Sequence, residues 1–94
     1  MEYILDIVLP NAFTPNGDGK NDTYRPVLLG GGTLIDFTIF NRYGEAVFHS
    51  TDLSNGWDGT INGKPAELET YLVMARVLVA NKEKVETGAV ILVR

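Results

Sequence analysis

Apolar and polar side chains alternate along much of the chain. The pattern is clearest in residues 34–41, where Ile35, Phe37 and Ile39 fall on one face and Asp36 and Thr38 on the other. Strict alternation over several residues is typical of a half-buried β-strand, because successive strand side chains point to opposite faces. This segment therefore predicts a strand with one face in a hydrophobic core.

The same pattern recurs along the chain, interrupted every few residues by Gly, Asn, Asp or Pro. Only residues 66–69 favour a helix, and this run is short and follows Pro65, so at most one turn is expected. We therefore predict an all-β fold, an antiparallel two-sheet sandwich of about seven strands. The predicted strands are residues 3–9, 34–41, 45–49, 60–61 with a return from Lys64, 70–80 and 85–93, joined by turns at Pro10-Asn11, Tyr43-Gly44, Asn62-Gly63 and 81–83.

Composition narrows the range of functions. The 94 residues correspond to one small domain. Eight Lys and Arg against twelve Asp and Glu give a net charge of −4, so neither nucleic acid nor an anionic membrane is an expected partner. There is no cysteine, which excludes disulfides and thiolate metal sites. The longest apolar run, residues 72–80, contains Arg76 and is too short to cross a bilayer, so membrane insertion is not expected either.

The densest polar cluster lies in residues 16–22. Asn16, Asp18, Asn21 and Asp22 are oxygen donors in a glycine-rich loop, which is the chemistry that calcium prefers. The loop is not an EF-hand, because Val27 stands at position twelve counted from Asn16, where a bidentate Glu is required. The alternative is a tight loop held by Asx-turns without a metal. The sequence thus indicates no required cofactor and one candidate calcium site.

A second motif is Trp57-Asp58-Gly59. A lone Trp in so small a sandwich is expected to fill the core, with its indole N–H bonded at the rim. We expect Asp58 to cap the turn and Gly59 to adopt a backbone conformation that other residues avoid. The alternative is a sugar-binding Trp, although carbohydrate sites usually gather several aromatic rings.

His49, Ser50 and Asp52 are the residue types of a hydrolytic triad. Neighbours in an extended chain point to opposite faces, whereas a triad converges from separate segments. The chain has no Gly-x-Ser-x-Gly elbow and no phosphate-binding loop followed by a lysine. An enzymatic function is therefore not expected.

Four separated features together resemble the gliding-motility-associated C-terminal domain of Bacteroidetes, the type B sorting domain of the type IX secretion system. They are residues 10–22, with the sequence PNAFTPNGDGKND; residues 37–44 followed by Val47-Phe48; Trp57-Asp58-Gly59 with residues 62–65; and residues 88–94. The resemblance covers nearly the whole chain. It departs from the family pattern at Tyr43, where Trp is usual, and at Glu69, where Gly is usual.

The resemblance implies an immunoglobulin-like sandwich that serves as a non-catalytic sorting signal. Residues 1–94 would form a single C-terminal domain excised from a larger exported protein, whose own leader carries it across the inner membrane. The expected partners are the type IX outer-membrane translocon, its associated outer-membrane proteins, and an N-terminal passenger domain in cis. The passenger would be delivered to the cell surface or the medium.

The apolar run at the end of the chain is expected to be tied into the sheet, and it could offer its backbone to the translocon by strand addition. On this hypothesis the recognition residues are Gly88, Val90, Leu92 and Arg94. One alternative function is a calcium-dependent adhesion or carbohydrate-binding module on an immunoglobulin-like scaffold. Another is a structural spacer from a repeat array, although the chain shows no internal duplication.

Overall fold

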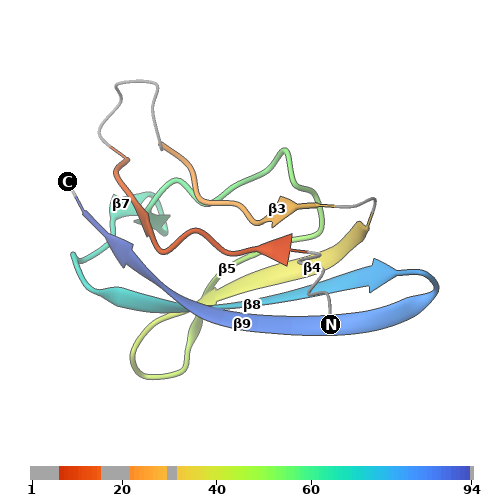
Figure 1. The fold of residues 1–94 in the computed structure, drawn as a ribbon. Helices are drawn as coiled ribbons and strands as arrows, with labels where there is room; N and C mark the ends of the chain where they lie inside the picture. The colour runs from red at the N-terminus through yellow and green to blue at the C-terminus, as the bar shows by residue number, and fades with distance from the viewer. Residues whose placement is uncertain (1–6, 16–21, 30–31, 94) are drawn as a thin grey trace.

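The structure is a computed structural model that describes residues 7–15, 22–29 and 32–93 (Figure 1). Within these ranges the regular secondary structure consists of strands and contains no helix, which confirms the predicted all-β class. Nor does this part of the chain hold a helix of the length and hydrophobicity needed to cross a membrane. The strands are β1 (Ile7–Val8), β2 (Ala12–Phe13), β3 (Val27–Leu28), β4 (Thr33–Phe40), β5 (Ala46–Ser50), β6 (Thr60–Ile61), β7 (Lys64–Pro65), β8 (Thr70–Val79) and β9 (Lys82–Leu92).

The centre of the fold is a five-stranded sheet in the order β2-β9-β8-β4-β5. Its longest pair is the β8/β9 hairpin, which runs without a register shift from Thr70↔Ile91 to Val79↔Lys82. Ala80 and Asn81 form the turn, and both have left-handed φ angles, of 52° and 65°. The sequence predicted this turn at residues 81–83 and the last strand from residue 85, and both predictions are wrong, because β9 already begins at Lys82. The two-residue turn draws residues 82–84 into the ladder although their side chains are exposed.

One strand pair is parallel. β2 runs alongside the end of β9 in the same direction, with Ala12 opposite Ile91 and Phe13 opposite Leu92. The prediction of a purely antiparallel arrangement is therefore wrong at this edge. β2 and β9 lie far apart in the chain, so no hairpin turn fixes them antiparallel. Pro10, which lacks an N–H, separates β2 from β1, and β1 pairs with β3 instead. The strand predicted over residues 3–9 is described only from Ile7, and residues 1–6 lie outside the described part.

Two short strand pairs lie outside the five-stranded sheet. β1 pairs with β3, a strand that the sequence pattern did not predict. β6 pairs with β7 through the predicted Asn62-Gly63 turn. Tyr24 and Trp57 form an isolated antiparallel bridge. In Figure 1 β1 and β3 form a layer separate from β4, β8 and β9, while β2 joins β9 at the edge of the sheet. The core lies between, and it contains Ile7, Phe13, Tyr24, Phe37, Ile39, Trp57, Ala66, Tyr71, Val73, Ala75, Val77, Val90 and Leu92.

The connection between β4 and β5 is wider than the tight turn predicted at Tyr43-Gly44. Asn41 organises it, because its Oδ1 accepts the backbone N–H groups of Tyr43 (2.9 Å) and Glu45 (3.0 Å). Gly44 has a φ of 81°. The ladder then slips by one residue, so that Phe40 lies opposite Ala46. This bulge matters for the site because it sets which side chains reach the outer face of the sheet.

Candidate recognition surface

Three of the sequence motifs meet at one end of the molecule, which we name the terminal corner and define by Phe13, Pro15, Trp57, Gly59 and Leu92. The rings of Phe13 and Trp57 lie 5.4 Å apart between centroids. Phe13 is also the ladder partner of Leu92. Figure 1 places the end of β9 and the β6/β7 hairpin at this same end. The corner therefore joins segments that are distant in the sequence.

Trp57 is the centre of the corner. Its side chain is fully buried, and its indole Nε1 donates a hydrogen bond to the carbonyl of Thr60 (2.9 Å). Its backbone N–H and C=O bond with those of Tyr24 (2.9 and 2.7 Å), and the Tyr71 ring packs 5.0 Å away. The prediction of a core Trp with its N–H bonded is confirmed. The alternative of a sugar-binding Trp is contradicted, because no face of the indole is open to a ligand.

Asp58 and Gly59 shape the turn that follows. Asp58 Oδ1 accepts the backbone N–H of Thr60 (3.0 Å) and its hydroxyl (2.6 Å), which confirms the predicted cap. Gly59 has a φ of 82°, and a Cβ placed there would lie 2.8 Å from Cγ of Pro15 and 3.5 Å from Cδ1 of Leu92. Gly59 is therefore required twice, for its left-handed backbone and for close contact with two other motifs.

The predicted recognition residues divide between two environments. Val90 and Leu92 are buried in the core, and Gly88 is half-buried beneath Leu9. Arg94 lies outside the described residues. The residues that alternate with these on β9 point to the outer face of the sheet, and the side chain of Ile91 is 50% exposed there. A partner on the outer face of the sheet would meet Ile91 and its exposed neighbours, whereas Val90 and Leu92 act by holding β9 in place.

The backbone at the end of β9 is already engaged within the domain. Ile91 N–H donates to Asn11 O (2.9 Å) and Val93 N–H donates to Phe13 O (3.0 Å), both on the β2 side. Leu92 N–H donates to Glu69 O (3.2 Å) on the β8 side. Strand addition at residues 91–93 would have to displace β2, so the last residues do not form an open edge.

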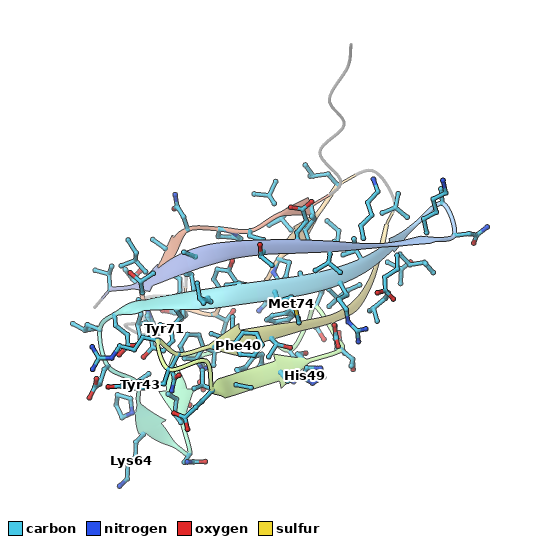
Figure 2. All side chains as sticks on the ribbon, turned by 90° about the horizontal axis from the view of Figure 1, so that it is seen from below. Phe40, Tyr43, His49, Lys64, Tyr71 and Met74 are labelled. Atoms are coloured by element: carbon cyan, nitrogen blue, oxygen red, sulfur yellow. The ribbon has the colours of Figure 1, made fainter. Side chains whose placement is uncertain are left out.

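The outer face of the sheet carries a shallow apolar groove. Phe40, Leu72, Met74 and Thr87 line it. Leu72 is 53% exposed, and Figure 2 shows Phe40 and Met74 on this face. Leu72 faces Phe40 on one side and Ala89 on the other in the ladder. The groove thus continues from the centre of the sheet to the last strand.

A charged cluster lies further along the same face. Asp36 accepts two hydrogen bonds from Arg76, Nε to Oδ1 (2.8 Å) and Nη2 to Oδ2 (2.7 Å), and its Oδ2 lies 3.2 Å from Nε2 of His49. These contacts, the hydrogen bonds from Arg76 above all, lower the pKa of Asp36 to about 2. No sequence motif indicated this cluster. The sequence signal that could have found it was Asp36, a charged residue inside the alternating segment of residues 34–41.

The arrangement around His49 separates the residues of the suspected triad. His49 contacts Asp36 on the outer face. Ser50 is buried, and its hydroxyl donates to the backbone carbonyl of Asp52 (2.8 Å). The prediction that contiguous residues fail to converge is confirmed, because histidine and serine side chains leave the strand on opposite faces.

The candidate calcium loop falls largely outside the described residues. Asn16, Asp18 and Asn21 are not described, and Asp22 is half-buried beside a shallow pocket with Thr23 and Arg25. Across residues 7–15, 22–29 and 32–93, no group of three or more His, Asp or Glu side chains could hold a metal ion. The calcium site therefore stays a prediction.

Comparison with known proteins identifies the chain. The family model of the CHU_C type IX secretion signal domain matches residues 7–92. Neither the curated proteins nor the solved structures contain a match. The matched segment includes the whole terminal corner and every strand from β1 to β9. The chain therefore belongs to the type IX secretion signal domain family, and its role is that of a C-terminal sorting signal.

Proposed function

We propose that residues 1–94 form a single, non-catalytic sorting domain that directs an N-terminal passenger in cis across the outer membrane. The partner is the type IX outer-membrane translocon with its associated proteins, and the destination is the cell surface or the medium. The observation that carries this proposal is the family match over residues 7–92. The proposed partners are proteins, and they include no sugar, nucleic acid or membrane lipid.

The fold that we propose for this role is an immunoglobulin-like sandwich. The five-stranded sheet supports it, because the β1/β3 pair and the Tyr24–Trp57 bridge cover one face of that sheet. Two layers with a Trp in the core between them are typical of this architecture. A translocon that serves unrelated passengers needs a shape that stays constant, and two packed layers supply it.

The outer face of the sheet is the surface that we propose the translocon contacts. It combines the groove at Leu72 and Met74 with the exposed Ile91. The terminal corner holds β9 against the core, so Gly88, Val90 and Leu92 contribute to recognition by fixing the strand. Arg94 lies outside the described residues and stays a candidate for recognition. Apolar surface of this kind on a small domain is typical of an interaction site.

Calcium remains a separate proposal for Asn16, Asp18, Asn21 and Asp22. Titration calorimetry of calcium into the wild type and Asp18→Ala tests it, with heat expected for the wild type alone. Flat traces for both proteins would exclude the site. The adhesion alternative has no support in the described residues, since Tyr43 is the one large exposed aromatic side chain among them.

Export of a fusion protein tests the sorting function. Residues 1–94 are fused behind a periplasm-directed fluorescent protein in a host with the type IX system, and we expect fluorescence in the medium or at the cell surface. Deleting residues 89–94 should abolish export, but this deletion also removes Val90 and Leu92 from the core. Ile91→Lys therefore tests the outer face, and Val27→Lys, at a similarly exposed position on β3, is the matched control.

We expect Ile91→Lys to leave the passenger in the periplasm and Val27→Lys to export it normally. Retention of the wild-type fusion with a folded domain would contradict the sorting function itself. Normal export of Ile91→Lys would contradict only the proposed contact surface. Circular dichroism of the purified variants shows whether each one is folded.

A further inference from the structure

Within residues 7–15, 22–29 and 32–93, most of β9 has no strand on its outer side, and we call this stretch its open edge. On the side away from β8, the pairs described for β9 are those of Ile91 and Leu92 with β2. Residues 82–87 are exposed along their whole length, and Figure 1 shows β9 extending with β8 well beyond β2. Within the described part of the chain, no strand pairs with this stretch on its outer side.

The backbone groups at this edge follow from the hydrogen bonds at its end. Ile91 N–H points away from β8, toward Asn11 O. Backbone direction alternates along a regular strand, and the β8/β9 register has no shift. Glu83, Val85 and Thr87 therefore also direct their N–H and C=O groups outward, as a template for another strand.

We propose that this edge pairs with the same edge of a second copy, with the two β9 strands antiparallel about a two-fold axis at Val85. Lys84 of each copy then lies opposite Glu86 of the other, which forms two ion pairs from one self-complementary sequence. Val85 lies opposite Val85 of the second copy on the outer face. Cross-strand pairs of opposite charge and of apolar side chains both stabilise a sheet.

The charge pattern selects this register from its neighbours. A two-fold axis at Glu83 places Glu83 opposite itself and Lys82 opposite Lys84. An axis at Lys84 or at Glu86 places that residue opposite its own copy. Like charges directly opposite destabilise a strand pair. The axis at Val85 is the one position among these four where unlike charges meet and no like charges do.

The same register satisfies the open backbone groups. Val85 exchanges two hydrogen bonds with Val85 of the second copy, and Glu83 does the same with Thr87, because all of these N–H groups point outward. The Thr87 hydroxyl also lies on the same face as the Glu83 carboxylate of the other copy. The result is one continuous sheet whose outer faces lie side by side.

A charge-swap experiment tests the register. Sedimentation velocity of the 94-residue chain is measured from about 10 µM to about 1 mM, a range suited to weak association. We expect wild type to form a dimer. Lys84→Glu and Glu86→Lys should each weaken self-association about tenfold or more, because each creates two like-charge contacts.

The mixture of the two variants gives the sharpest result. Lys84→Glu and Glu86→Lys together should form a heterodimer, since every contact at these positions is again between unlike charges, and the double variant should dimerise with itself. A mixture no more associated than its components would overturn the register. A wild type that remains monomeric at about 1 mM would overturn the proposal.

Proline at position 85 tests the backbone contacts. Val85→Pro removes an N–H that points away from β8, so the hairpin ladder is preserved and the edge is blocked. We expect a folded monomer. Val85→Thr, which keeps the N–H and the branched shape, is the control and should dimerise. A dimer that survives Val85→Pro would show that the copies associate through another surface.

Discussion

Replacing Gly59 by Ala should destabilise the terminal corner more than a matched change elsewhere. Gly59 has a φ of 82°, and its missing Cβ leaves the space into which Pro15 fits. A new Cβ would lie 2.8 Å from Cγ of Pro15, which is closer than such atoms pack. The proline ring is closed onto its own backbone nitrogen and cannot rotate away, so relief requires the backbone to move.

The expected magnitude has two parts. A left-handed conformation costs a residue with a Cβ about 1–2 kcal/mol. Overpacking by one methyl group in a filled site costs about 1–3 kcal/mol more. Gly59→Ala should therefore lower the free energy of unfolding by about 2–5 kcal/mol, and each kcal/mol lowers the Tm of a domain this size by about 4–8 °C.

Gly63→Ala supplies the control. Gly63 has a φ of 79°, nearly that of Gly59, but a methyl group at this position would meet nothing within 4 Å. The substitution should therefore cost only the conformational part, about 1–2 kcal/mol. Urea unfolding followed by the fluorescence of the buried Trp57 measures both variants. Equal destabilisation by the two substitutions would refute the contact between Gly59 and Pro15.

Three other changes test separate parts of the structure. Asp36→Asn should lower the free energy of unfolding by about 2 kcal/mol near pH 7, because folding lowers the pKa of Asp36 from its ordinary value of 3.8 to about 2. In the wild type this stability is present above pH 4 and is lost as the pH falls toward 2. Unfolding curves measured across that pH range would show the loss. Asn41→Ala should lower the free energy of unfolding by about 1–2 kcal/mol, because it removes the acceptor of two backbone N–H groups. The Tm measures this loss, and an unchanged Tm would contradict the prediction. Trp57→Phe should lower the free energy of unfolding by about 2–4 kcal/mol, because it leaves a void and removes the hydrogen bond to the Thr60 carbonyl. Circular dichroism follows the unfolding. A denaturation midpoint equal to that of the wild type would contradict the central role of Trp57.

Local sequence patterns were sufficient for the long strands. β4 contains an alternating stretch from Ile35 to Ile39, and β8 is a long run rich in apolar and β-branched residues, so both strands could be predicted. A buried face was predicted for β4 alone, and there Phe37 and Ile39 are buried while Asp36 and Thr38 on the opposite face are buried as well. Asn62-Gly63 specified its own turn, since both residues accept left-handed backbone. The core position of Trp57 followed from its size and from the absence of any other Trp. The family resemblance rested on the order of these same motifs.

Other features depended on contacts between distant segments. β2 and β3 have two residues each, too few to show a period, and they are strands only because β9 and β1 lie beside them. The hairpin turn formed at Ala80-Asn81, where the register of β8 against β9 required it.

The sequence by itself determined where most of each long strand lies and the family to which the chain belongs, because both depend on the local order and spacing of residues. Only the tertiary structure decided that Asp36, His49 and Arg76 form one charged cluster and that Gly59 contacts Pro15 and Leu92. It also decided that residues 82–87 of β9 have no strand on their outer side among the described residues. These contacts join residues that are far apart in the chain, and their positions depend on how the strands pair, which no local pattern specifies.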